Sequence, residues 1–163
     1  MTMRSAESKI LTRDQLAQLA PRWREAGAQV VLTNGCFDLL HSGHLRYLQE
    51  ARRLGDLLIV GVNSDESVRQ LKGESRPIVP QQERAELVAG LECVDYVTIF
   101  EEPIAVPLVE LVQPTYYAKG GDYTEQDLPE AEAVVAYGGF VVILPLQPER
   151  STSALIERIR SGK

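Results

Sequence analysis

The chain contains two histidines, and they lie three residues apart in the segment Thr33-Asn34-Gly35-Cys36-Phe37-Asp38-Leu39-Leu40-His41-Ser42-Gly43-His44. An apolar run at residues 30–32 precedes this segment, and a helix-like pattern follows it from Leu45. A strand, a glycine-bearing turn and a helix start together present exposed backbone amides and the positive end of a helix dipole. Imidazoles at such a position favour a site for phosphate groups, and therefore for a nucleotide.

Apolar and amphipathic segments alternate along the rest of the chain. We expect strands at about residues 29–33, 57–62, 97–100, 115–118 and 140–144, and helices at about residues 12–27, 45–54, 80–91, 104–112, 129–137 and 152–160. This alternation predicts an α/β fold, a Rossmann-like five-stranded parallel sheet with right-handed crossovers and helices on both faces. Residues 1–27 are expected to form a helical extension packed on a domain of residues 28–163.

Local signals refine these elements. Thr12 and Gln15 have the spacing of a capping box, so a helix is expected to begin there, and Pro21 is expected to divide or kink it. Leu45 and Leu87 are expected on the buried faces of their helices. The uninterrupted apolar run at residues 57–62 is typical of a strand that is covered on both faces.

Polar residues follow four of the five expected strands. In an open α/β sheet the ligand lies beyond the carboxyl ends of the strands, so these residues are expected to share one crevice. The candidate catalytic residues are His41, His44, Lys72 and Arg76. The candidates for binding nucleotide or phosphate are Asn34, Gly35, Cys36, Phe37, Asp38, Gly43, Arg84, Lys119, Gly120, Asp122, Arg150, Ser151 and Thr152.

Composition excludes several other classes of protein. The net charge of -6 is unfavourable for nucleic-acid binding, and no apolar run approaches the length of a membrane span. Two cysteines do not make a disulfide framework, and the polar N-terminus lacks a signal-peptide core, so a cytoplasmic location is expected. No P-loop, G-x-G-x-x-G fingerprint or G-x-S-x-G elbow is present.

Two motifs resemble those of a known superfamily. The run His41-Ser42-Gly43-His44 matches the H-x-G-H signature of cytidylyltransferase-like nucleotidyltransferases, and Arg150-Ser151-Thr152-Ser153 matches their Ser/Thr motif at the last helix. The resemblance extends from about residue 30 to residue 159. Finer detail at residues 33–38, 119–123 and 149–152 resembles D-glycero-β-D-manno-heptose 1-phosphate adenylyltransferases.

The resemblance implies an activity and a set of partners. The expected reaction moves AMP from ATP to the sugar 1-phosphate, with Mg²⁺ held mainly by the phosphates and with no dedicated protein ligands for the metal. In this family the domain is often fused to a sugar kinase, so a separate heptose kinase is expected to supply the substrate. By the same resemblance, Asp38 organises the first loop, and residues 119–122 lie near the nucleoside. Relatives often form dimers, which leaves a homodimer as an expectation.

Individual residues suggest roles within that reaction. His41 and His44 would donate hydrogen bonds to the triphosphate, and Gly43 would allow a close approach of backbone and phosphate. Lys72 and Arg76 lie in a polar stretch that is expected to be a mobile loop closing over the phosphates. Arg84 is expected to clamp a phosphate. The segment from Lys119 is expected to be a loop.

Other interpretations stay open on sequence alone. The two histidines could be ordinary caps or, with Cys36, zinc ligands. The chain could use CTP and an alcohol phosphate such as glycerol 3-phosphate, or it could bind a nucleotide without catalysis. Related cytidylyltransferases carry an arginine several residues before the Ser/Thr motif, whereas here Arg150 directly precedes Ser151. This departure weakens the cytidylyl interpretation.

Overall fold

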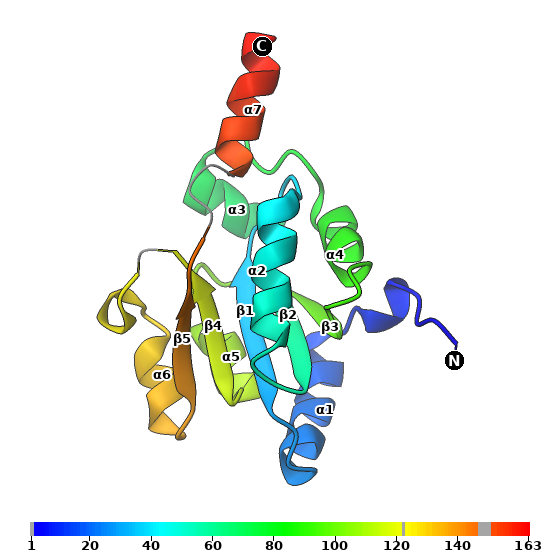
Figure 1. Ribbon diagram of the computed structural model, residues 1–163, viewed down its shortest axis with the longest axis vertical. Helices are drawn as coiled ribbons and strands as arrows, with labels where there is room; N and C mark the ends of the chain where they lie inside the picture. Colours follow the sequence, from blue (N-terminus) through cyan, green and yellow to red (C-terminus); the bar gives the residue numbers. More distant parts are fainter. Residues whose placement is uncertain (1, 122, 147–150) are drawn as a thin grey trace.

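A parallel β-sheet forms the centre of the molecule (Figure 1). The computed structural model describes residues 2–121, 123–146 and 151–163. Within these residues the sheet has five strands, in the order β3-β2-β1-β4-β5, and every pair of neighbours is parallel. The strands are β1 (Val30–Gly35), β2 (Leu57–Asn63), β3 (Tyr96–Phe100), β4 (Tyr116–Gly120) and β5 (Phe140–Leu144). The predicted Rossmann-like α/β fold is confirmed.

Helices cover both faces of this sheet. One face packs against α2 (Ser42–Arg52) and α4 (Gln81–Ala89), and the other against α1 (Arg13–Glu25), α5 (Val106–Val112) and α6 (Ala131–Ala136). The remaining helices are α3 (Asp65–Lys72), α7 (Thr152–Ser161) and the short 3₁₀ turns η1 (Glu7–Lys9) and η2 (Glu125–Asp127). Alternate residues of β1 and β2 point to opposite cores, which explains their unbroken apolar sequences.

The strand order creates a switch point beside β1. From β1 the chain moves outward through β2 to β3, and it then returns to the other side of β1 to form β4 and β5. The connections on the two sides of β1 therefore diverge, and a crevice opens between the carboxyl ends of β1 and β4. The crevice lies where the sequence places Asn34 and Lys119.

The first helix is integral to one of the two cores. The capping box is present, because the Thr12 side chain accepts from the Gln15 amide and the Gln15 side chain accepts from the Thr12 amide. Leu16 is fully buried in the core beneath β1, and Ile10 makes an isolated bridge to Val97 of β3. The helix is continuous through Pro21, so the expectation that Pro21 divides it is wrong. The proposed boundary after residue 27 stays a prediction.

Two residues expected in the core lie at the surface instead. Leu45 is 38% exposed and Leu87 is 54% exposed. In α4 the buried face consists of Arg84, Ala85, Val88 and Ala89, which places Leu87 on the opposite side of the helix. The helix α4 is rotated about its axis so that the charged Arg84 is buried. The spacing of apolar residues alone does not indicate this rotation.

The strand β4 extends further than expected. Lys119 and Gly120 are its last residues and pair with Ile143 and Leu144 of β5, so they do not form a loop. A Cβ atom on Gly120 would lie 2.6 Å from a methyl group of Leu146, so only glycine fits without a shift of that side chain. The β4 end is therefore a rigid part of the sheet.

We expect Leu16→Ala to lower the free energy of unfolding by about 2–5 kcal/mol, because it leaves a cavity in a closed core. Leu87→Ala is the matched control, and it should change the free energy by no more than about 0.5 kcal/mol because the side chain is half exposed. Urea unfolding followed by circular dichroism measures both. Equal losses in the two variants would contradict the assignment of the α4 surface.

Candidate active site

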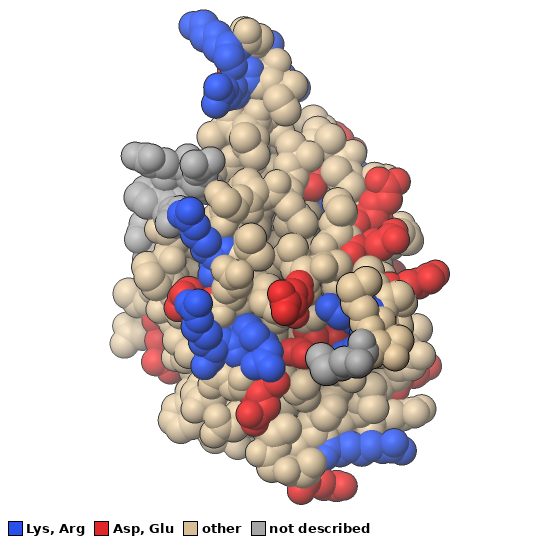
Figure 2. Space-filling model, turned by 45° about the vertical axis from the view of Figure 1, so that its right-hand side comes forward, with Lys and Arg blue, Asp and Glu red and all other residues tan. Residues whose placement is uncertain are grey.

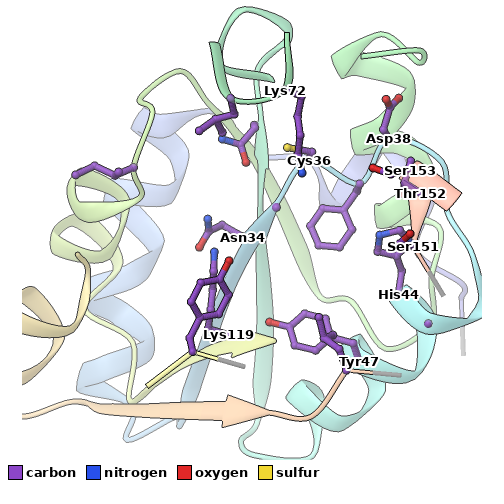
Figure 3. A pocket seen from close by; sticks show the side chains of 18 of the residues that line it. Asn34, Cys36, Asp38, His44, Tyr47, Lys72, Lys119, Ser151, Thr152 and Ser153 are labelled. Atoms are coloured by element: carbon purple, nitrogen blue, oxygen red, sulfur yellow. The ribbon is translucent and has the colours of Figure 1, made fainter. Parts of the chain in front are cut away.

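A cavity of about 610 Å³ lies at the carboxyl ends of the strands (Figure 3). Most of the residues predicted from the sequence line it, namely Asn34, Gly35, Cys36, Phe37, Asp38, His41, Gly43, His44, Lys72, Arg76, Lys119, Ser151 and Thr152. Gly120 does not line the cavity itself, but it lies against Leu146 and Tyr47, which do. Asp122 and Arg150 were also predicted, and they lie outside the described residues.

The two histidines are fixed by backbone hydrogen bonds at the start of α2. The helix begins at Ser42, earlier than the sequence pattern indicates, and His41 is its N-cap. The His41 Nδ1 accepts from the Gly43 amide at 3.1 Å, and the His44 Nδ1 accepts from the His41 amide at 3.2 Å. Because each Nδ1 is an acceptor, the proton of the neutral ring is on Nε2 in both residues. The ring centroids are 3.9 Å apart.

The charge state of His44 follows from its surroundings. Burial, together with the smaller effect of the neighbouring His41, lowers the pKa of His44 to about 4. The ring also packs against Phe37, with centroids 5.5 Å apart. At neutral pH His44 is therefore an uncharged hydrogen-bond donor through Nε2, which is suited to a phosphate oxygen and unsuited to accepting a proton from a substrate.

The carboxylate of Asp38 holds together the segment that follows α3. Asp38 is almost fully buried and accepts hydrogen bonds from the Ile78 and Val79 amides at 2.9 Å and from Arg76 Nε at 2.7 Å. Burial by itself would raise the pKa of Asp38, but the two amides and the Arg76 guanidinium lower it overall. Arg76 is thereby anchored at the cavity wall, with a side chain only 12% exposed.

The expected mobile loop at residues 63–77 is mostly structured. Ser64 caps α3 by accepting from the Ser67 amide, and Lys72 is the last residue of that helix. Lys72 is exposed and reaches the cavity rim from the side opposite Lys119, as Figure 3 shows. The two cations predicted to close over phosphates therefore differ, because Arg76 is paired and anchored whereas Lys72 is solvated.

The prediction that Arg84 clamps a phosphate is wrong. Its side chain is fully buried, and its guanidinium donates to the carbonyls of Val79 and Cys36 and pairs with Asp65 at 2.9 Å. Arg84 does not line the cavity. It joins α4 to the β1–α2 loop and to α3, so it supports the site from within the protein.

The N-terminus of α7 meets the β1–α2 loop at the cavity. The Ser151 side chain accepts from the Ala154 amide at 3.0 Å, and the Thr152 hydroxyl donates to the Leu39 carbonyl at 3.1 Å. Figure 3 shows Ser151, Thr152 and Ser153 beside His44. Two helix N-termini therefore converge on one side of the cavity, an arrangement that favours anions.

The opposite side is formed by the ends of β1 and β4. The Tyr117 hydroxyl donates to Asn34 Oδ1 at 2.5 Å, which leaves the amide N–H groups of Asn34 for the cavity. Burial lowers the pKa of Lys119, and the charge of Glu130 opposes that effect. Cys36 is partly buried, and burial raises the pKa of its thiol, so it is not activated as a nucleophile.

Several residues of the cavity wall were not assigned a role from the sequence. These are Tyr47, Asn63, Leu71, Pro103, Ile104, Tyr123, Asp127, Leu128, Pro129, Glu130, Leu146 and Ser153. Tyr47 lies one helical turn after His44 and could have been found by that spacing, and Asn63 directly follows a predicted strand. Leu71 and Ser153 belong to α3 and α7, and most of the others come from connections whose path depends on tertiary packing.

Other kinds of site were also sought among the described residues. Within this part of the chain no group of three His, Cys, Asp or Glu side chains is arranged to hold a metal ion. No helix of the described segments is long and apolar enough to cross a membrane. Figure 2 shows acidic and basic side chains interspersed on the face in view, with basic groups gathered at the upper end where Figure 1 places α7.

Comparison with known proteins agrees with this geometry. Residues 32–158 match the Cytidylyltransferase-like family. The chain belongs to that family. The match spans both helix N-termini that form the anion-favouring side of the cavity, so this member is a nucleotidyltransferase.

Individual relatives are closely similar but longer. The chain is 51% identical over 154 residues to the "Bifunctional protein HldE" of Pelobacter propionicus and 47% identical over 153 residues to that of Geobacter sulfurreducens. These alignments cover 94% of this chain but only 32% and 31% of the relatives. The cytidylyltransferase-like chain thus spans about a third of the curated relatives it matches.

Solved structures share the fold. The "lipopolysaccharide core biosynthesis protein" of Thermoplasma volcanium has a TM-score of 0.62 and 30% identity, covering 74% of this chain and 98% of its own. The pantoate-beta-alanine ligase of Francisella tularensis also has a TM-score of 0.62, with 14% identity, covering 88% of this chain and 68% of its own. At that identity it supports the fold alone.

We expect His44 to titrate near pH 4 in the folded protein, below the ordinary value of about 6.5. Between these values the unfolded chain binds a proton that the folded chain does not, so stability falls as pH falls from 6.5 towards 4. Two-dimensional NMR of the imidazole nitrogens measures both the pKa and the Nε2–H tautomer. A His44 pKa at or above 6.5, or an Nδ1–H tautomer, would contradict the hydrogen-bond assignment.

Proposed function

We propose that this chain transfers AMP from ATP to D-glycero-β-D-manno-heptose 1-phosphate and releases pyrophosphate. The observation that carries the proposal is the pair of histidines at the α2 N-terminus, each with Nδ1 occupied by a backbone amide. The similarity to proteins named "Bifunctional protein HldE" supports the heptose substrate. The word "bifunctional" agrees with the fusion to a kinase that the sequence resemblance implies.

The reaction requires little acid–base chemistry. An anionic oxygen of the sugar phosphate attacks the α-phosphorus of ATP, a new P–O bond forms, and the bond from that phosphorus to the bridging oxygen of pyrophosphate breaks. The nucleophile is already charged, so no proton has to be removed from it. Catalysis then consists of positioning and of stabilising charge that develops on the leaving group.

The proposed roles follow from the geometry of the cavity. His41 and His44 donate through Nε2 to the triphosphate, and the amides at the starts of α2 and α7 bind its oxygens. Arg76 adds a fixed positive charge, and Lys72 adds a mobile one from the rim. Apart from Lys72, the groups that hold the pyrophosphate are thus already in place and need no rearrangement during the reaction.

The site is compatible with Mg²⁺ that is coordinated mainly by the phosphates of the substrate. Both oxygens of the buried Asp38 carboxylate already accept protein hydrogen bonds, and no three-residue cluster of metal ligands is present in the described segments. Mg²⁺ would therefore be held mainly by phosphate oxygens and would neutralise part of their charge. The kinase that supplies the sugar phosphate, the cytoplasmic location and a homodimer remain parts of the proposal.

A panel of substrates tests the reaction. The purified chain is incubated with Mg²⁺ and either ATP or CTP, and with either the heptose 1-phosphate or glycerol 3-phosphate, while pyrophosphate release is measured. We expect release with ATP and the heptose 1-phosphate only. Turnover that requires CTP and glycerol 3-phosphate would contradict the proposal in favour of the cytidylyl reaction, and nucleotide binding without turnover would indicate a non-catalytic module.

The His41→Ala variant should lower kcat by at least about 10²-fold, the usual loss when a preorganised stabiliser of developing charge is removed. His41→Asn is the companion variant, because its side chain can still cap α2 but is too short to place a donor where Nε2 lies. It should fold like the parent and lose activity to a similar extent. Full activity in His41→Asn would show that His41 acts only as a helix cap.

A further inference from the structure

A buried carboxylate faces the cavity from the start of α6. Glu130 is 4% exposed, and one of its oxygens accepts from the Ala105 amide at 3.0 Å. The residue lines the cavity, and no other described residue donates a hydrogen bond to its carboxylate. A carboxylate in such a place is costly unless it is hydrogen-bonded, so its second oxygen is suited to a donor from a ligand.

An ammonium group lies on the same side of the cavity. Lys119, at the end of β4, is close enough to Glu130 for their charges to interact, yet among the described residues its ammonium group forms no ion pair and no hydrogen bond. The amide of Asn34 adds N–H donors there, since its oxygen is held by Tyr117. Figure 3 shows Asn34 and Lys119 on the side of the cavity opposite His44 and Ser151.

The direction of attack indicates what occupies this side. In phosphoryl-type transfers the attacking and leaving oxygens are roughly in line across the phosphorus. The pyrophosphate is proposed to lie against His44 and the α7 N-terminus, so the nucleophile must approach from the opposite side. That side contains Asn34, Lys119 and Glu130.

We propose that Glu130 and Lys119 form the binding site for hydroxyl groups of the acceptor sugar, with one hydroxyl donating to Glu130 and accepting from Lys119. This inference rests on the proposed adenylyl transfer. It assigns Lys119 to the acceptor, whereas the sequence resemblance placed it near the nucleoside. Glu130 thereby becomes a residue that determines acceptor specificity, and the Ala105 amide holds it in position.

The charges on this wall favour a polyol over other ligands. A phosphate would be repelled by the Glu130 carboxylate, whereas this carboxylate and the Lys119 ammonium together suit a group that can both donate and accept a hydrogen bond. Apolar residues, among them Leu128 and Pro129, line the cavity beside Glu130, so the preference rests on the two charges and not on the polarity of the whole wall. A hydroxyl is both donor and acceptor, so it satisfies a carboxylate and an ammonium that do not reach each other.

The Glu130→Gln variant tests the assignment, because glutamine keeps the size and an oxygen for the Ala105 amide while removing the charge. Calorimetric titration with D-glycero-β-D-manno-heptose 1-phosphate, in the presence of α,β-methylene-ATP and Mg²⁺, gives the acceptor affinity. We expect at least about tenfold weaker binding, the scale of losing a charged hydrogen bond. Affinity for α,β-methylene-ATP alone should change by less than about twofold, since the nucleotide does not contact Glu130.

Two controls separate ligand binding from structure. Glu132→Gln removes an exposed carboxylate from the same helix and should leave acceptor binding unchanged. Inorganic phosphate should bind Glu130→Gln no more weakly than the parent, because the lost charge repels phosphate. If Glu130→Gln unfolds, Lys119→Gln gives an independent measurement on the other half of the site. This variant should also weaken binding of the sugar phosphate at least about tenfold.

Three outcomes would overturn the inference. The first is an unchanged acceptor affinity in folded Glu130→Gln, or in Lys119→Gln if Glu130→Gln unfolds. The second is a loss of nucleotide affinity in place of acceptor affinity. The third is a parent protein that binds no sugar phosphate. Failure of the proposed function has a different signature, in which the parent binds the sugar phosphate but releases no pyrophosphate. In that case the titrations still decide whether Glu130 binds the acceptor.

Discussion

The divergence of the chain on the two sides of β1 is the constraint on which the site depends. Parallel strands end at one edge of the sheet, and the connections after β1 and β4 leave that edge in different directions. The crevice at this point lies outside the two cores, which close separately on the two faces of the sheet. Every residue with a proposed chemical role lies at a strand end, at a helix end or on a connection at this crevice.

Buried ionic groups give the connections their fixed positions. Asp38 holds residues 76–79 through two amides and an ion pair, and Arg84 joins the Cys36 and Val79 carbonyls to Asp65. Backbone groups in buried loops have no ladder partners, so side chains must satisfy them. These two charged residues therefore stabilise the fold around the site. The neutral histidines and the less constrained Lys72 and Lys119 can bind a ligand.

The cavity has two chemically distinct sides. Around His44 and the α7 N-terminus, helix dipoles and neutral donors favour phosphate oxygens. Around Lys119, a carboxylate and an amide accompany the cation, which suits a ligand with hydroxyl groups. This division agrees with a reaction in which an anionic leaving group and a polyol phosphate occupy opposite sides of one phosphorus.

The sequence by itself determined the features that arise from local spacing. Alternating apolar segments predicted five strands close to the observed ones, the Thr12 capping box formed as expected, and the three-residue spacing put His41 and His44 on one helix start. Such features depend on neighbours within about one helical turn or one strand, so the order of residue types is sufficient to indicate them.

Only the tertiary structure decided what each charged residue does. Nothing in the local sequence distinguishes Arg84, which is buried and paired, from Lys72, which is exposed at the cavity rim. The role of Glu130 depends on the Ala105 amide, which lies 25 residues away in the chain. The physical reason is desolvation, because a charge becomes structural or available to a ligand according to partners that folding brings from distant segments.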